Sequence, residues 1–431
     1  MITERDGILS RAGGAAPIFE WLTWLSSEKW KAFSLIFALS MSVRLISLAR
    51  TPRERIVTPA EAEKIALALA AKGEFADPYV IPTGYTAHCP PFYPLLVSGI
   101  YRAFGSGYAG NMVRCILLIS VYSIFYGLFP WFARAFGFPS AVGAMAGLVS
   151  AVVPLKRSAE VFLGWEEPYS AFLIVGLFLL TRRIWTNGGG LGLAVLYGVV
   201  WGVAFHMTPS LLPVALGLCA VDLFRFRAKA KTQTVGWWAI SLTAMALTVL
   251  PWTVRNHERL GGWIFMRSNA GIELYIANQD GAQPSNGENA AVLRRAHPFR
   301  SQAVARRIKE IGEVAYNREL LQKTVAWMAA RPWTFLSLTS RRVVYFWLGP
   351  PESLATTIPT AIITVLALLG LWTMGASHPI ETWLFGTAWL LYPLIYYLVS
   401  YSHRYRAPME WTITLCACAF VWRKLEAASG G

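Results

Sequence analysis

Long apolar runs alternate with polar stretches along most of this chain. The runs are about 18–22 residues long, the length that crosses a bilayer core at a rise of 1.5 Å per residue. They predict about ten membrane-spanning helices, over residues 30–49, 111–132, 138–155, 161–180, 190–207, 209–224, 235–252, 355–375, 382–401 and 407–422. Two shorter apolar stretches, Pro91–Phe104 and Trp333–Leu348, are interfacial, re-entrant or additional short spans. The pattern therefore predicts an all-α polytopic membrane protein with about 10–12 transmembrane helices.

The short loops between the runs predict the orientation. Arg182-Arg183, the basic residues of 225–231 and Arg423-Lys424 fall on one side, so the positive-inside rule places both termini in the cytoplasm. The predicted organisation has four parts. They are a cytoplasmic N-terminal segment (1–29), an N-terminal transmembrane module (30–252) with a first outer loop over about 50–110, an outer-face loop domain (253–345), and C-terminal transmembrane helices with a cytoplasmic tail (346–431).

The outer segments contain predicted helices of their own. Residues 59–72 are helix formers with apolar residues at helical spacing, Pro59 suits a first turn, and Gly73 suits a helix end. This pattern predicts an amphipathic helix along the outer membrane surface. Residues 301–330 are also predicted to be helical. The expected architecture is a helical bundle with helical periplasmic loops on one elaborated face.

Composition excludes several classes of protein. The 431 residues include 39 Lys and Arg against 24 Asp and Glu, a net charge of +15, yet only 15% are charged and 55% are hydrophobic. A soluble chain of this size carries more charge, and much of the basic excess lies in short loops, so nucleic acid is not an expected partner. The five cysteines lack the spacing of a disulfide framework or zinc site. The sequence contains neither a Walker A motif nor a GxGxxG motif after a strand, so it does not indicate nucleotide binding.

Ionisable residues gather where the predicted spans meet the outer face. Glu61 and Glu63 open the first outer helix, and Glu166-Glu167 lie at the outer end of a span. Another span ends with Arg255-Asn256, and His403, Arg404, Tyr405 and Arg406 precede the last span. This arrangement indicates a reaction site at the boundary between membrane and water.

Four stretches together resemble the GT-C fold glycosyltransferases that use polyprenyl-phosphate sugars, the superfamily of protein O-mannosyltransferases and the lipid A aminoarabinose transferase. They are Gly73-Glu74-Phe75 with His88–Leu96, Pro251–Asn256 with Ser268–Gly271 and Asn278, His297-Pro298 with the helix to Arg331-Pro332, and Arg404–Pro408. The resemblance covers most of the chain and implies a GT-C type bundle. It does not specify a substrate.

One position departs from that superfamily. Its members usually carry an acidic residue, often Asp-Glu, in the first outer loop as the catalytic base, and that pair would fall on Thr58-Pro59 here. The base is therefore either Glu61, displaced by one turn, or another group such as Glu166. A phosphate leaving group needs no acid, because arginine or a divalent metal can hold its charge.

The candidate residues follow from this chemistry. Glu61 and Glu166 are the catalytic candidates, and the substrate-binding candidates are Glu63, His88, Tyr93, Arg255, Asn256, His403, Arg404 and Arg406. Several also have an ordinary alternative. Glu166 would be an acid that favours a helix N-terminus. Glu61 and Glu63 would form the solvent-exposed face of an interfacial helix. The arginines would extend to the lipid head groups and anchor the chain there. His88 would be a structural loop residue. No cofactor is certain, and a divalent metal, Mg²⁺ or Mn²⁺, is left open.

The leading hypothesis is an integral-membrane glycosyltransferase that inverts the sugar and uses a carboxylate base. It would move a sugar from a polyprenyl-phosphate carrier to a lipid, glycan or protein acceptor on the non-cytoplasmic face. A bacterial inner membrane, with the active site on the periplasmic face, is the expected location. The alternatives are a transporter or flippase of a lipid-linked substrate and a non-catalytic scaffold. Transporters favour repeated halves and midplane charges, neither of which marks this sequence.

Overall fold

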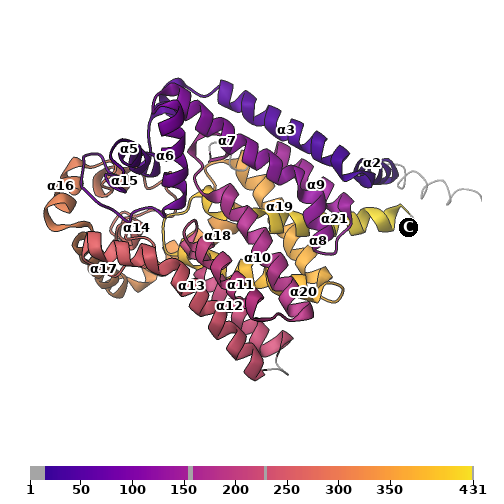
Figure 1. The fold of residues 1–431 in the computed structure, drawn as a ribbon. Helices are drawn as coiled ribbons and strands as arrows, with labels where there is room; N and C mark the ends of the chain where they lie inside the picture. The colour runs from indigo at the N-terminus through magenta and orange to yellow at the C-terminus, as the bar shows by residue number, and fades with distance from the viewer. Residues whose placement is uncertain (1–14, 154–158, 228–230, 430–431) are drawn as a thin grey trace, which may run out of the picture.

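The computed structural model describes residues 15–153, 159–227 and 231–429 (Figure 1). Among these residues all regular secondary structure is helical. Extended residues pair only in two isolated bridges, Ala76 with Tyr85 and Ser285 with Tyr401. The predicted all-α class is confirmed.

Six helices of the described part are long and apolar enough to cross a membrane. They are α3 (Lys29–Ala49), α7 (Tyr108–Gly127), α10 (Glu167–Asn187), the stretch Pro209–Phe226 that contains α12 (Leu212–Val221), α13 (Lys231–Leu260) and α19 (Leu354–Met374). The other four predicted spans, 138–155, 190–207, 382–401 and 407–422, also fall on helices, namely α9 (Ser140–Val152), α11 (Leu191–Phe205), α20 (Pro379–Leu391) and α21 (Glu410–Ala428); residues 154 and 155 lie outside the described part. The predicted span 111–132 ends in a second helix, α8 (Phe129–Ala135). The predicted class of polytopic helical membrane protein is therefore confirmed.

Prolines explain two boundaries that differ from the predicted ones. The run 161–180 begins at the end of a short π-helix, Ala159–Leu163, and becomes α-helical only from Glu167, where Pro168 occupies the first turn and needs no hydrogen-bond partner. The run 382–401 leaves the α-helix at Leu391 and continues as a 3₁₀ turn, Tyr392–Tyr397, because Pro393 cannot donate the next backbone bond.

The two segments that the sequence predicts on the outer face are called the first outer segment (about 50–110) and the second outer segment (253–345). The first contains α4 (Arg53–Val57), α5 (Glu61–Lys72) and α6 (Phe92–Phe104). Helix α5 matches the predicted outer helix and ends at Gly73, whose φ of 74° is the left-handed conformation of a helix end. Its apolar face, with Ile65 and Leu69, packs against Val97 of α6. The segment therefore has a small apolar core, which Trp165 before α10 and Trp252 of α13 complete.

The second outer segment contains α14 (Ala270–Ala277), α15 (Ala290–Ala296), α16 (Gln302–Ile311), α17 (Glu313–Ala330) and α18 (Pro332–Leu348). Helices α16 and α17 confirm the prediction for 301–330. The two outer segments share one apolar cluster, in which Tyr79 of the first packs with Ile272 and Ile308 of the second. Helices α5 and α14–α17 lie together at one end of the molecule, opposite α2 (Ala15–Ser27) and the end of α21 (Figure 1).

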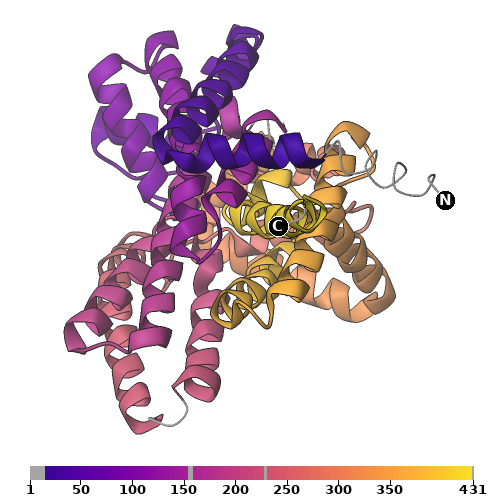
Figure 2. The same cartoon turned by 90° about the vertical axis from the view of Figure 1, so that its right-hand side faces the viewer.

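Helix α21 lies near the middle of the bundle, between the N-terminal helices and α19 and α20 (Figure 2). It contributes Trp411, whose ring contacts Phe136, Phe178 and Phe385 from three other segments. Aromatic rings in such edge-on and tilted pairs bury large apolar areas. The last helix therefore fills the core that the earlier helices surround.

Two arginines of membrane helices are buried inside the protein, as the cost of facing lipid predicts. Arg44 of α3 is 3% exposed and lies 2.5 Å from Glu160. Arg114 of α7 is 4% exposed and lies 3.3 Å from Glu63 of the first outer segment. Each buried cation therefore has a carboxylate partner.

Candidate active site

Glu166 and Glu167 lie at the N-terminal end of α10, where Glu167 organises the surrounding groups. The Trp165 amide donates to Glu167 Oε2 at 2.6 Å, and Arg404 Nε lies 2.7 Å from Oε1. The guanidinium of Arg404 lies 4.2 Å from the centre of the Trp165 ring, a cation–π distance. Burial opposes the charge of Arg404, but three carboxylates, Glu167 first, raise its pKa above the ordinary value. Arg404 is a fixed cation at this end of the bundle.

Glu166, next to Glu167 in sequence, has a pKa that is shifted towards neutral pH. It is partly exposed. Burial and then the charge of Glu167 raise the pKa of Glu166 to about 7, although Arg404 and Arg267 act in the opposite direction. A carboxyl group with a pKa near the working pH suits proton transfer, because both of its forms are populated.

Arg267 connects this end to the outer segments, although no motif in the sequence pointed to it. It lies on the loop between α13 and α14, and its Nε donates to the carbonyl of His88 at 3.0 Å. Its charge also acts on Glu166. The adjacent stretch Ser268–Gly271 is one of those that resemble the GT-C superfamily, but the resemblance does not include Arg267.

Glu61, His88 and His297 converge from three separate segments. They come from the start of α5, the loop before α6 and the residue after α15. One ligand atom from each lies within 4.8 Å of the other two. His297 Nε2 lies 3.9 Å from Glu61 Oε1, and the two imidazole centres are 5.8 Å apart. Both histidines are buried, whereas Glu61 is partly exposed.

A buried hydrogen-bond chain orients His88. The Tyr79 hydroxyl donates to Glu313 Oε2 at 3.1 Å and lies 3.2 Å from His88 Nδ1. Because the tyrosine proton goes to the carboxylate, its oxygen accepts from His88 Nδ1–H, and the Nε2 lone pair stays free. Burial, and then the charges of His297 and Arg267, lower the pKa of His88 well below its usual value. His88 is therefore neutral.

Glu313 itself is held by several donors. It accepts from the Thr86 hydroxyl at 2.6 Å and the Ala87 amide at 3.0 Å, and also from the Ser268 hydroxyl. These donors come from the first outer segment and from the loop before α14. Glu313 thus bonds the two outer segments to each other behind His88.

Two predicted binding residues bond to each other inside the first outer segment. The Tyr93 hydroxyl donates to Glu63 Oε1 at 3.1 Å, and Glu63 also pairs with Arg114. The Tyr93 ring stacks on Trp165 with centres 6.4 Å apart. Tyr93 and Glu63 thereby support the ring on which Arg404 lies.

Arg255 and Asn256 hold the first outer segment against α13. Arg255 donates to the carbonyls of Thr86 at 2.6 Å and Phe75 at 2.9 Å. Asn256 is fully buried, accepts from Arg255 at 3.1 Å and donates to the carbonyl of Ile264 at 3.2 Å. These bonds give both residues a supporting place beside the site.

The three candidates before α21 occupy different environments. Arg406 is 2% exposed and is enclosed by Glu410 at 2.7 Å and Thr364 at 2.8 Å. Arg404 faces Glu167, as described above. His403 is exposed and lines a pocket.

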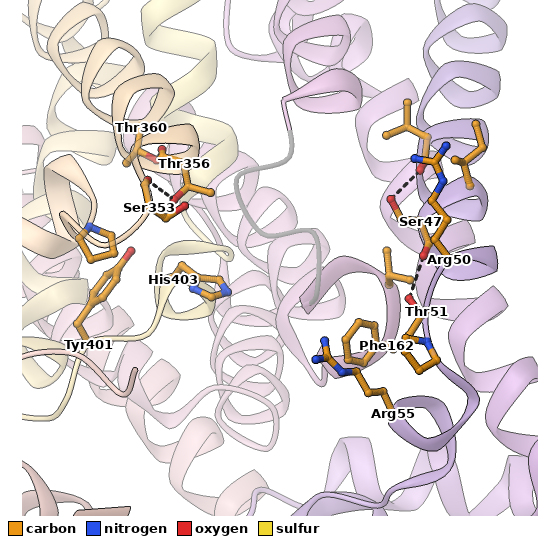
Figure 3. Close-up of a pocket in the computed structure, with 15 residues that line it drawn as sticks. Ser47, Arg50, Thr51, Arg55, Phe162, Ser353, Thr356, Thr360, Tyr401 and His403 are labelled. Carbon is orange, nitrogen blue, oxygen red and sulfur yellow. Dashed lines mark hydrogen bonds between the residues drawn. The ribbon is translucent and has the colours of Figure 1, made fainter. Parts of the chain in front are cut away.

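That pocket has a volume of about 620 Å³ and lies between α3 and α19, beside the loop before α21 (Figure 3). One wall carries Arg50, Arg55 and Phe162, and the other carries Thr356 and His403 (Figure 3). The α3 wall continues into Ile46, which is 52% exposed on a membrane-length helix. The pocket therefore combines basic groups with a side that an apolar chain can reach.

Comparison with solved structures finds a similar fold in the oligosaccharyltransferase of Archaeoglobus fulgidus. Its complex with zinc and sulfate has a TM-score of 0.53 at 13% identity and covers 93% of this chain. Its complex with an inhibitory peptide and a dolichol-phosphate has a TM-score of 0.51 at 14% identity and covers 95%. Its apo form has a TM-score of 0.53 at 14% identity and covers 92%.

This chain spans about half the length of those proteins, 50%, 53% and 51% in the same order. No protein-family model matches it, and no curated protein matches it either. The structural likeness therefore establishes a fold shared with an archaeal oligosaccharyltransferase.

Proposed function

We propose that this chain is an integral-membrane glycosyltransferase of the GT-C type with a polyprenyl-phosphate sugar as donor. One observation carries the proposal. Glu166 and the fixed cation Arg404 lie close together, and each follows a residue of the pocket wall closely in sequence, Phe162 and His403. The fold shared with an oligosaccharyltransferase supports the same reading.

The pocket matches an amphipathic donor. Arg50 and Arg55 are exposed, and no carboxylate of the described residues pairs with either. They are available to a phosphate, which arginine binds through charge-assisted hydrogen bonds. The apolar side towards Ile46 would receive the polyprenyl chain from the bilayer. A similar structure holds a dolichol-phosphate, which supports this class of lipid.

Glu166 is our candidate for the general base. In the proposed step an acceptor hydroxyl oxygen attacks the anomeric carbon as the bond from that carbon to the phosphate oxygen breaks. Glu166 takes the hydroxyl proton, and the polyprenyl phosphate leaves with the bonding electron pair. Arg404 and the pocket arginines stabilise its negative charge. Attack opposite the leaving group inverts the anomeric configuration.

The acceptor would be a lipid, glycan or protein on the non-cytoplasmic face, and a bacterial inner membrane is the proposed location. The helices of the outer segments gather at one end of the molecule (Figure 1), and Arg267, on the loop before α14, bonds to the loop of His88 and also acts on Glu166. A similar structure contains an inhibitory peptide, which keeps peptides among the acceptors to be tested.

The test is a transfer assay on purified protein in lipid, with radiolabelled polyprenyl-phosphate sugars and a membrane extract as acceptor. Glu166→Gln removes the base and Arg404→Gln removes the cation, so both should lose transfer. Glu310→Gln and Arg318→Gln change exposed residues of α16 and α17 and should retain it. Gel filtration and thermal unfolding check that each variant is folded.

Labelled acceptor formed by the wild type and both controls, but by neither site variant, is the expected result. Full transfer by Glu166→Gln would move the base to Glu61. Movement of the labelled donor across the bilayer with no transfer would contradict the enzyme and favour the flippase.

A further inference from the structure

We propose that Glu61, His88 and His297 bind one divalent transition-metal ion, with Zn²⁺ the best match, and that this ion joins the two outer segments. The inference goes beyond sugar transfer and is measured without a donor or acceptor. Glu61 and His88 belong to the first outer segment, whereas His297 belongs to the second. An ion held by all three would connect parts of the chain that are far apart in sequence.

The donor atoms lie close to the spacing that such an ion requires. Tetrahedral zinc sites place nitrogen and oxygen ligands about 2.0–2.2 Å from the ion, so the ligand atoms are about 3.3–3.6 Å apart. Here Glu61 Oε1 and His297 Nε2 are separated by 3.9 Å, and all three candidate atoms lie within 4.8 Å. Small side-chain rotations would close the site, and water would supply the fourth ligand.

Tyr79 and Glu313 hold His88 in the way that neighbouring residues usually hold a metal-binding histidine. Ligating histidines usually donate their other ring N–H to a fixed acceptor, which sets the tautomer. His88 Nδ1–H faces Tyr79, which Glu313 holds in turn, so the free Nε2 is the atom offered to the ion. Tyr79, His88 and Glu313 are all buried.

His297 requires one rearrangement. The Phe299 amide donates to His297 Nδ1 at 3.2 Å, which places the ring proton on Nε2, towards Glu61. Ligation through Nε2 moves that proton to Nδ1 and breaks this long contact. The segment after α15 should therefore shift when the ion binds.

The donor set also selects among metals. Two imidazoles and one carboxylate suit zinc and its first-row neighbours, whereas Mg²⁺ prefers oxygen ligands and retains its waters. The sequence alone leaves Mg²⁺ or Mn²⁺ open for the reaction itself. The present site favours Zn²⁺ in a connecting role.

The test uses full-length protein in detergent, purified without a polyhistidine tag and freed of metal with a chelator. Zn²⁺ is titrated against a coloured zinc indicator, and thermal unfolding is followed with and without the ion. We expect about one equivalent bound and a higher Tm with Zn²⁺ but not with Mg²⁺. Glu61→Gln, at a partly exposed site, should lose at least tenfold in affinity and the Tm shift.

Two further variants separate ligation from folding. Tyr79→Phe keeps the ring but removes the hydroxyl, and should weaken zinc binding by about 10–100-fold. His257→Ala removes an exposed histidine that stacks on Trp263 and should leave binding unchanged. Equal zinc binding by the wild type and a Glu61→Gln/His297→Ala double variant would overturn the proposal, as would a wild type that binds no zinc. Neither outcome depends on the transfer assay.

Discussion

A single carboxyl group, that of Glu166, sets the expected pH dependence of the reaction. Burial and Glu167 raise its pKa to about 7, so below that pH most of the molecules carry a protonated group that cannot accept a proton. We expect kcat/KM for transfer to rise about tenfold per pH unit up to about pH 7 and then to level off. Rates measured from pH 5.5 to 9 on folded protein check this, and a flat profile would contradict the assignment.

The variant Glu166→Gln tests the role of the same carboxyl group directly. A general base typically contributes about 10²–10⁴-fold, so the variant should lose a comparable factor in kcat and also lose the rise with pH. Single-turnover rates with saturating donor separate this loss from a change in binding. A variant that retained the wild-type profile would assign the titration to another group.

The buried ion pair of Glu63 and Arg114 should contribute to the stability of the fold. Both side chains are almost fully buried, 3% and 4% exposed. Removing one partner of a buried ion pair costs about 3–5 kcal/mol, since the other charge stays uncompensated. Glu63→Gln should therefore lower the Tm clearly, whereas Glu54→Gln, exposed on α4, should not. The double variant Glu63→Gln/Arg114→Met should recover part of the loss.

At the scale of elements, α19 and α21 approach each other through Gly370. A Cβ at this position would lie 2.1 Å from the Cys416 carbonyl, so only glycine allows this contact. Gly370→Ala should force the helices apart and destabilise the protein by about 1–3 kcal/mol. Gly176→Ala on α10 is the matched control, because a Cβ there meets nothing within 4 Å. Similar thermal unfolding of both variants would contradict the close packing.

The elements were largely predictable, and the site was predictable in part. Apolar runs of bilayer length and the Gly73 stop depend on local sequence, so the spans and α5 follow from pattern alone. The sequence pointed to Glu166 and Arg404 because span ends were expected to gather at one face, and the structure brings these two residues together. Arg267 and the approach of His297 to Glu61 were not, since they depend on how two long outer segments fold against each other. Such long-range contacts leave no local periodicity.

At the scale of the whole molecule, the pocket between α3 and α19 should determine donor affinity. Arg50→Ala/Arg55→Ala removes two exposed arginines of its wall, and each charge-assisted bond to a phosphate contributes about 1.5–3 kcal/mol. The double variant should raise the KM for donor at least tenfold with little change in kcat. Arg318→Ala, exposed on α17, is the control. An unchanged KM would place the donor elsewhere.

The two walls of that pocket are made at very different times during synthesis. Helix α3 enters the membrane early, but α19 and the loop that carries His403 follow only after most of the chain has been translated. If this pocket binds the donor, as we propose, a nascent chain that lacks α19 has only one of its walls and would not bind the donor. Translation stopped before α19 would then leave a membrane-bound protein without transfer activity.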